Sequence, residues 1–249
     1  MRTLSLALAG LFAYAGAALA QTGNCMEAAA LVHADAGLSR AAAAIAGRHE
    51  LKVAVAGSTS SILAGPGGTR AAYPVRLQST LSERLPEVAV TVANTAKPRQ
   101  TAAEMQADFG RLLAAQKPDL VIWQTGTVDA MRGIDVDQFR AALEKGVDQL
   151  HTGGADVLLM NMQYSPRTES MIAADTYAEI MRGVALRYEI PLFDRLAVMK
   201  AWNDEGTFDL STATKNSEMA EHVHVCIGRL LADLVVEAID FAREAKQEK

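Results

Sequence analysis

Four consecutive hydroxyl side chains, Ser58 to Ser61, follow a short apolar run in the first part of the chain. The run from Lys52 to Ala56 predicts a buried strand, and Gly57 marks its end. Ligands of open α/β sheets bind at the carboxyl ends of the strands, and a hydroxyl there can attack a substrate once a base activates it. Hydroxyl residues are also common in turns and at helix N-caps. The segment therefore has two interpretations, a nucleophile or a turn.

The elements that would position these hydroxyls alternate between strand and helix. Short apolar runs predict the strands, and apolar residues at helical spacing predict the helices. Strands are expected at residues 51–56, 88–92, 119–123, 156–162 and 191–193, and helices within 26–48 and at 71–85, 101–116, 136–150, 168–188, after 193 to 202, and 218–245. This alternation predicts an α/β fold with a mostly parallel five-stranded sheet and helices on both faces. A site would lie in the loops after residues 56, 92, 123 and 162, with the loop before the last helix.

Length and composition fit one large globular domain. The chain has 249 residues, of which 50% are hydrophobic and 21% are charged. That balance supports a sizeable hydrophobic core. The formal net charge of -5 comes without any basic cluster, so nothing in the sequence favours nucleic acid as a partner.

The first twenty residues have the pattern of a secretory signal peptide. Arg2 gives a positive start, residues 4–19 are apolar, and residues 18–20 have the small-x-small form of a cleavage site. We expect cleavage before Gln21, a helical segment at 21–50 and the α/β domain at 51–249. No other run is long enough to span a membrane. The mature protein is therefore expected to be exported, as a periplasmic or secreted protein.

Export affects how the two cysteines are interpreted. Cys25 lies near the mature N-terminus and Cys226 near the C-terminus. In an oxidising compartment an even pair is most simply a disulfide. Such a bond would close a loop of about 200 residues and stabilise the fold by several kcal/mol. The alternative is two unrelated buried thiols.

The order and spacing of several segments resemble those of the SGNH (GDSL-type) hydrolases, over most of the mature chain. Val53 to Gly57 ends where the family's first block has Gly-Asp-Ser, and residues 94–96, Asn-Thr-Ala, lie where the second block has Asn-x-Gly. Residues 118–127, Pro-Asp-Leu-Val-Ile-Trp-Gln-Thr-Gly-Thr, are similar to the strand leading into the third block, Gly-Thr-Asn. The resemblance implies a three-layer α/β/α, flavodoxin-like fold and ester hydrolysis. Cys226 is also similar in position to a cysteine of exported bacterial members of the family, which supports the disulfide.

The residue at the position of the family's nucleophile is changed. Aligned on Gly57, the family's catalytic serine corresponds to Thr59. Threonine has a usable hydroxyl, but its extra methyl group crowds the attack and restricts its rotamers. Ser58 and Ser60 flank Thr59, and either could substitute for it after a slip of one residue.

The family's oxyanion donors are changed as well. The resemblance implies a backbone N–H at the second-block glycine and a side-chain amide at the third-block asparagine, and these positions hold Ala96 and Val128. Ala96 keeps its N–H, whereas the Val128 side chain donates nothing. The adjacent Asp129 would bring the wrong charge for stabilising an oxyanion. These three residues are expected to line the pocket, together with Gly57, Ser58 and Gly126.

The family's base is the poorest match. Its Asp-x-x-His block should fall near Lys215 and Glu218, and His222 and His224 come about one turn later. Because they lie two positions apart, the two histidines point to different faces of a helix and at most one can serve. His222 is the candidate base, and the alternative for each is a structural or surface histidine. The same geometry argues against a metal site, and no cofactor is expected.

Changes at the nucleophile, donors, base and orienting acid favour a degenerate, catalytically impaired member of the family. Such a protein would bind a glycan, an acyl ester or a partner in the cell envelope. The alternative is an active atypical esterase or deacetylase, in which Ser60 or Thr59 attacks an acyl ester and His222 is the base. Glu218 or Glu221 would then orient the imidazole. A structural subunit of an envelope complex is a third reading.

Overall fold

The sheet has five parallel strands in the order β2–β1–β3–β4–β5. The computed structural model describes residues 25–63, 68–211 and 217–247, so the expected signal peptide lies outside the described residues. The strands are β1 (Glu50–Ala56), β2 (Ala89–Asn94), β3 (Leu120–Gln124), β4 (Asp156–Met160) and β5 (Leu192–Phe193). The predicted α/β fold with a five-stranded sheet is confirmed, and all four strand pairs are parallel.

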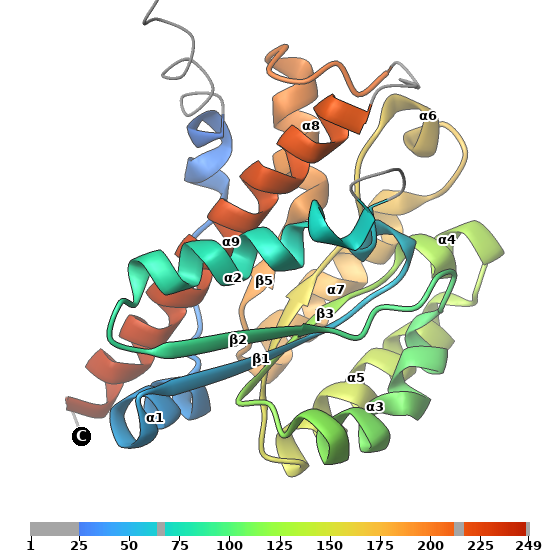
Figure 1. Cartoon of the computed structure of the whole chain (residues 1–249). Helices are drawn as coiled ribbons and strands as arrows, with labels where there is room; N and C mark the ends of the chain where they lie inside the picture. Colours follow the sequence, from blue (N-terminus) through green and yellow to red (C-terminus); the bar gives the residue numbers. More distant parts are fainter. Residues whose placement is uncertain (1–24, 64–67, 212–216, 248–249) are drawn as a thin grey trace, which may run out of the picture.

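Helices cover both faces of the sheet (Figure 1). One face carries α1 (Ser39–Arg48), α2 (Tyr73–Arg84) and α9 (Ser217–Gln247), and the other carries α3 (Ala102–Gln116), α5 (Val136–Thr152) and α7 (Ala174–Tyr188). The remaining helical segments are η1 (Met26–Leu31), η2 (Thr59–Ser61), η3 (Gly68–Arg70), α4 (Thr127–Arg132), α6 (Pro166–Glu169) and α8 (Arg195–Asp204). The result is the expected three-layer arrangement.

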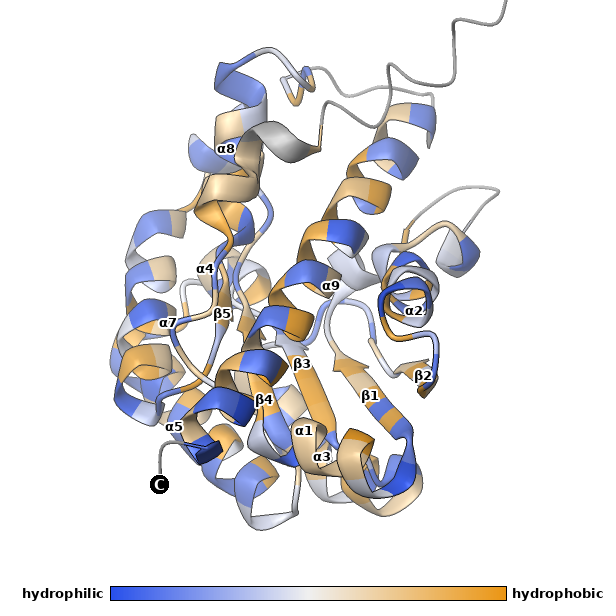
Figure 2. Ribbon diagram, turned by 90° about the vertical axis from the view of Figure 1, so that its left-hand side faces the viewer, coloured by the Kyte–Doolittle hydropathy of each residue, from blue (hydrophilic) through white to orange (hydrophobic). Residues whose placement is uncertain are grey.

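The middle of the sheet forms the core. Every residue of β3 and β4 is buried, as expected for parallel strands that are covered on both faces. Figure 2 shows the hydrophobic colour on these strands and in alternating bands along α9. Helix α9 buries apolar residues three or four positions apart, from Val223 to Ile239, which is the spacing of one helical face. None of the helices in the described residues combines the length and hydropathy of a membrane span.

A disulfide joins the first described residue to the last helix. Cys25 and Cys226 are bonded, with 5.1 Å between their Cα atoms and 201 positions between them in the sequence. Both residues are buried, so the bond anchors η1 against the long helix α9. The predicted disulfide is confirmed.

Two sequence predictions of helices need correction. The single helix expected at 168–188 is wrong, because α6 and α7 are separate. Ser165 accepts the N–H of Thr168 as an N-cap, and Pro166 occupies the first turn, so that a short helix forms before the chain turns. The second correction is α4, a helix that the sequence analysis did not expect. Gly126 has φ of 99° and Gly133 has φ of 61°, and these two glycines allow the chain to enter and leave a short helix directly after β3.

Candidate functional site

The loop after β1 presents the predicted hydroxyls in one short turn, η2. Ser58 is buried, and its backbone N–H donates to Oε1 of Gln124 at 3.1 Å. Thr59, at the family's nucleophile position, is exposed, and its Oγ1 accepts the backbone N–H of Arg99 at 3.3 Å. The Thr59 hydroxyl therefore lies at the surface and contacts the loop that follows β2.

Ser61 is the hydroxyl that the fold holds in place, and sequence reasoning did not single it out. Its Oγ lies 3.0 Å from Oε1 of Gln124 and 2.9 Å from the hydroxyl of Tyr73, and all three side chains are buried. Burial raises the pKa of Tyr73 to about 12, so the phenol stays protonated and can donate. A Cβ at Gly57 would lie 2.3 Å from the Ser61 Oγ. Glycine at position 57 is thus required by the close approach of Ser61.

Ser60 lies between these two environments. Its Oγ is buried and has no hydrogen-bond partner in the described part of the chain. Its carbonyl oxygen is 3.5 Å from Nη1 of Arg195, a long contact at the limit of a hydrogen bond. Of the three hydroxyls around the family's nucleophile position, Ser60 alone combines a buried oxygen with an unused hydrogen-bonding capacity.

Arg195 brings a positive charge beneath this loop. It opens α8 directly after β5, is 1% exposed, and its Cζ lies 6.0 Å from the centre of the Tyr73 ring. Burial lowers the pKa of its guanidinium to about 10. No carboxylate of the described residues pairs with it. Its position at the carboxyl end of a strand was the available sequence signal, and sequence reasoning missed it.

The two candidate histidines have different environments on α9. His224 is 6% exposed, and its Nδ1 accepts the backbone N–H of Tyr73 at 2.9 Å. Burial, with a contribution from Arg195, lowers the pKa of His224 to about 3, which leaves a weak base. His222, the predicted base, is half-buried. Within residues 25–63, 68–211 and 217–247, no hydrogen bond joins either imidazole to Ser58, Thr59 or Ser60.

The oxyanion positions are also occupied by local contacts. The backbone N–H of Ala96 donates to Oδ1 of Asn94 at 3.1 Å, so the donor that the family pattern requires is already used. Val128 lies half-buried in α4. Gly126 is needed for packing, since a Cβ there would lie 2.4 Å from the Sδ of Met162. Lys215, near the expected orienting acid, lies outside the described residues.

Asp129 has a structural environment. Its carboxylate is 1% exposed and accepts the backbone N–H of Ala102, at 3.0 Å and 3.2 Å from its two oxygens. Thr125 donates to it at 3.4 Å. Burial raises the pKa of Asp129, while these hydrogen bonds oppose the rise. The side chain therefore satisfies a donor in the first turn of α3, a use that the sequence alone did not reveal.

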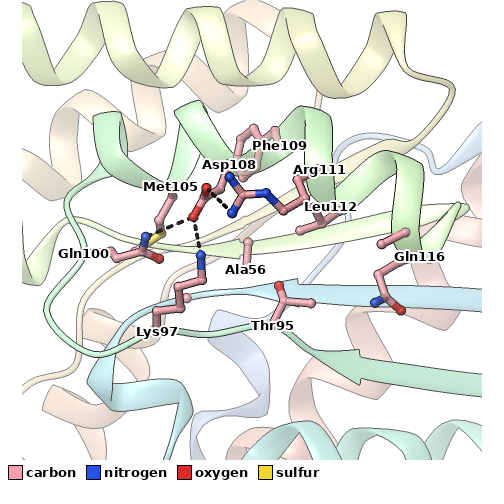
Figure 3. Close-up of a pocket in the computed structure, with 12 residues that line it drawn as sticks. Ala56, Thr95, Lys97, Gln100, Met105, Asp108, Phe109, Arg111, Leu112 and Gln116 are labelled. Carbon is pink, nitrogen blue, oxygen red and sulfur yellow. Dashed lines mark hydrogen bonds and ion pairs between the residues drawn. The ribbon is translucent and has the colours of Figure 1, made fainter.

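A pocket of about 190 Å³ opens beside the ends of β1 and β2, under α3 (Figure 3). Ala56 and Gly57 contribute from β1 and the loop after it, and Thr95 and Lys97 from the loop after β2. The rest of the lining comes from α3 and the residue Gln100 before it. Within the described residues, no group of three or more His, Cys, Asp or Glu side chains is placed to hold a metal ion.

The sequence of the chain matches the model of a known protein family. The model of the Non-GDSL lipase-like family matches residues 24–241. The chain belongs to the Non-GDSL lipase-like family. No curated protein shows a significant match.

Solved structures similar to this Non-GDSL lipase-like protein have the SGNH hydrolase fold. TesA is 21% identical, with a TM-score of 0.55 over 72% of this chain and 96% of TesA. A putative lipolytic protein of the G-D-S-L family from Desulfitobacterium hafniense DCB-2 is 18% identical, with a TM-score of 0.54 over 72% and 99%. A catalytic mutant of Axe2, an acetylxylan esterase from Geobacillus stearothermophilus, is 19% identical, with a TM-score of 0.57 over 73% and 93%. At these identities the likeness is one of fold.

The contrast with Axe2 concerns the catalytic residues. The mutants of Axe2 described as catalytic replace a serine, an aspartate and a histidine. In this Non-GDSL lipase-like chain the hydroxyls after β1 contact a glutamine, a tyrosine and a backbone N–H. The loop after β1 brings Ser58, Thr59 and Ser60 together, but within the described residues no hydrogen bond joins them to His222 or His224 as a triad.

Proposed function

We propose that this protein is an exported member of the SGNH hydrolase fold that binds a ligand without hydrolysing an ester. The candidate ligands are a glycan, an acyl ester or a partner in the cell envelope. The observation that carries the proposal is the missing contact between a hydroxyl and an imidazole at the end of β1 in the described residues. A serine hydroxyl is a weak nucleophile unless a base within hydrogen-bond reach takes its proton.

Two further features support this proposal. His224, the buried imidazole of the pair, has a pKa lowered to about 3 and its Nδ1 occupied by a backbone N–H. Such a group is far from the pKa near the working pH that a general base needs. The position of the family's asparagine donor is filled by Val128, which cannot stabilise an oxyanion with its side chain.

Export is supported by the sequence and by the disulfide. The apolar first twenty residues have the composition of a signal peptide. The bond between Cys25 and Cys226 is of the kind that persists in oxidising compartments. These two features together support a periplasmic or secreted location.

A second candidate function is favoured by Ser60. Its Oγ is buried and has no hydrogen-bond partner among the described residues, so it is available to attack an acyl group if His222 reaches it when substrate binds. Catalytic hydrogen bonds are often long in the absence of substrate and shorten in the complex. An atypical esterase or deacetylase with Ser60 as nucleophile is therefore the competing hypothesis.

Hydrolysis of 4-nitrophenyl acetate by the protein beginning at Gln21 distinguishes the two functions. The variants are Thr59→Ala, Ser60→Ala and His222→Ala, with Ser79→Ala, at an exposed serine on α2, as the matched control. We expect all five proteins to give the same background rate, with folding checked by circular dichroism. Turnover that Ser60→Ala and His222→Ala abolish while Ser79→Ala preserves it would establish the esterase and overturn the proposal.

A further inference from the structure

The pocket under α3 exists because the side chains beneath it are small. Residues alternate between the two faces of a strand, so Ala54 and Ala56 of β1 face one side of the sheet, while Val53 and Val55 face the other. Ala56 lines the pocket, with Thr95 beside it from the loop after β2. Strand β2 is at the edge of the sheet, and Figure 3 shows Thr95 and Lys97 on the side of the pocket opposite the lining residues of α3.

The wall of the pocket on α3 is apolar. Met105, Phe109 and Leu112 recur at helical spacing and contribute to it, and Ala115 extends it by one turn. Apolar surface of this kind gains free energy when a ligand displaces water from it. The pocket therefore suits a hydrocarbon chain more than a sugar ring, which would need many hydrogen-bond partners.

The mouth of the pocket carries a positive charge. Lys97 pairs with Asp108, and Nη1 of Arg111 lies 3.1 Å from the other Asp108 oxygen. Gln100 also donates to Asp108, at 3.3 Å. Hydrogen bonds from Lys97 and Gln100 lower the pKa of Asp108, so the carboxyl is ionised. Two cations thus face one carboxylate, and the excess of one positive charge favours an anion.

We propose that this pocket binds a short aliphatic carboxylate, with its chain along α3 and its carboxylate at Lys97 and Arg111. The assignment rests on the proposed function, because Gly57 belongs to both the candidate site and this pocket. A volume of about 190 Å³ holds a chain of about six carbon atoms, taking ~30 Å³ for each group the size of a water molecule. The two carboxylate oxygens would then lie at the exposed mouth. Hexanoate is the matching probe.

The indole of Trp123 gives a direct reading of occupancy. Its Nε1–H lies 3.3 Å from the Sδ of Met105, and its ring meets Phe109 edge to face, with 4.8 Å between the ring centres. Both partners line the pocket. A ligand that contacts Met105 and Phe109 in the pocket should change the surroundings of the indole. It should therefore shift the indole N–H signal of Trp123 in a nuclear magnetic resonance titration. The chain has two tryptophans, and Trp202→Phe assigns the signal.

The titration compares three probes with the same chain: hexanoate, hexanol and hexyltrimethylammonium. For a ligand of this size we expect a Kd for hexanoate of about 1 mM. We expect affinity to fall about fivefold for hexanol, since the charge contact is lost at an exposed mouth, and no binding of the cation. Equal binding of all three probes, or no shift with hexanoate, would overturn the assignment.

Two substitutions on α3 form a matched pair. Ala115 lines the pocket and is exposed, whereas Ala114 is exposed on the same helix and is not part of the lining. We expect Ala115→Phe to abolish hexanoate binding and Ala114→Phe to leave it unchanged. Lys97→Ala should weaken hexanoate about fivefold without affecting hexanol. Identical loss in both phenylalanine variants, or none in either, would contradict the assignment.

The two proposals fail separately, because binding and hydrolysis are measured in different assays. Hexanoate binding that Ala115→Phe blocks, combined with ester turnover that Ser60→Ala abolishes, would retain the pocket and overturn only the proposed function. A protein with neither turnover nor a hexanoate shift would overturn the pocket assignment alone.

Discussion

Acidification should destabilise this protein through His224. Burial of the imidazole is the main reason that a charge on His224 is disfavoured, and the nearby guanidinium of Arg195 adds to it. The Nδ1 atom also accepts the backbone N–H of Tyr73 at 2.9 Å. A protonated imidazole cannot accept that hydrogen bond. The folded protein therefore keeps His224 neutral down to a pKa of about 3, whereas the unfolded chain protonates it near about pH 6.5.

The sign and size of the effect follow from these two values. As pH falls below about 6.5 the unfolded state binds a proton that the folded state does not, so the free energy of unfolding decreases until about pH 3. Between about pH 7.5 and about pH 5, linkage gives a loss of about 2 kcal/mol from this one group. Other groups titrate in the same range, so the comparison needs a variant that differs at His224 alone.

His224→Asn provides that variant, because an amide oxygen can accept the Tyr73 N–H but does not titrate. Urea unfolding of wild type and variant at both pH values gives four free energies. Between the higher and the lower pH, we expect the variant to lose about 2 kcal/mol less free energy of unfolding than wild type. Ser79→Ala, at an exposed serine that does not titrate, should retain the wild-type difference. If wild type and His224→Asn respond to pH equally, the neutral buried histidine is refuted.

Three other predictions concern stability. Asp156 is buried and accepts two backbone N–H groups of α1, and burial raises its pKa to about 6. The folded state therefore binds a proton at Asp156 before the unfolded state does. Acidification from about pH 7.5 to about pH 5 should add about 1 kcal/mol to the free energy of unfolding through this group in wild type but not in Asp156→Asn, as measured by urea unfolding. Replacing Cys25 and Cys226 by alanine should lower the free energy of unfolding by about 2–5 kcal/mol, and a change below about 1 kcal/mol in calorimetry and urea unfolding would contradict this. Arg195→Met should raise the free energy of unfolding by about 1 kcal/mol, because an apolar side chain avoids the desolvation of a buried guanidinium without a carboxylate partner in the described residues; a lower melting temperature would disprove it.

The strands and helices of the sheet could largely be predicted because burial and alternation are local properties of the sequence. The apolar run of β3 and the capped start of α3 at Thr101 are examples, since each can be identified from its own residues. The long helix expected at 168–188 failed because a capping serine and a proline act over only three residues, which a helical periodicity does not register. Helix α4 is shorter than two full turns and has no clear apolar face.

The candidate site was harder to predict because its contacts join distant segments. Tyr73 meets His224 across 151 positions, and Ser60 meets Arg195 across 135. The family pattern predicts His222 as the base, but it is His224 that lies on the face of α9 toward the buried Tyr73. The spacing does not decide which of the two faces the core, because both have apolar residues three or four positions away, Met219 and Cys226 for His222 and Ala220 and Ile227 for His224.

The polar groups at the carboxyl edge of the sheet explain why fold and hydrolysis can separate. Ser61 and Gln124 hold the loop after β1 against Tyr73, and Asp129 holds the start of α3. Each of these groups satisfies a buried partner, so it is fixed by folding and cannot respond to charge that develops on a substrate. The pocket under α3 differs, because its walls are apolar and its charges are exposed at the mouth. Electrostatic free energy that stabilises the loops is unavailable for chemistry, whereas an open apolar surface beside two cations remains available for binding.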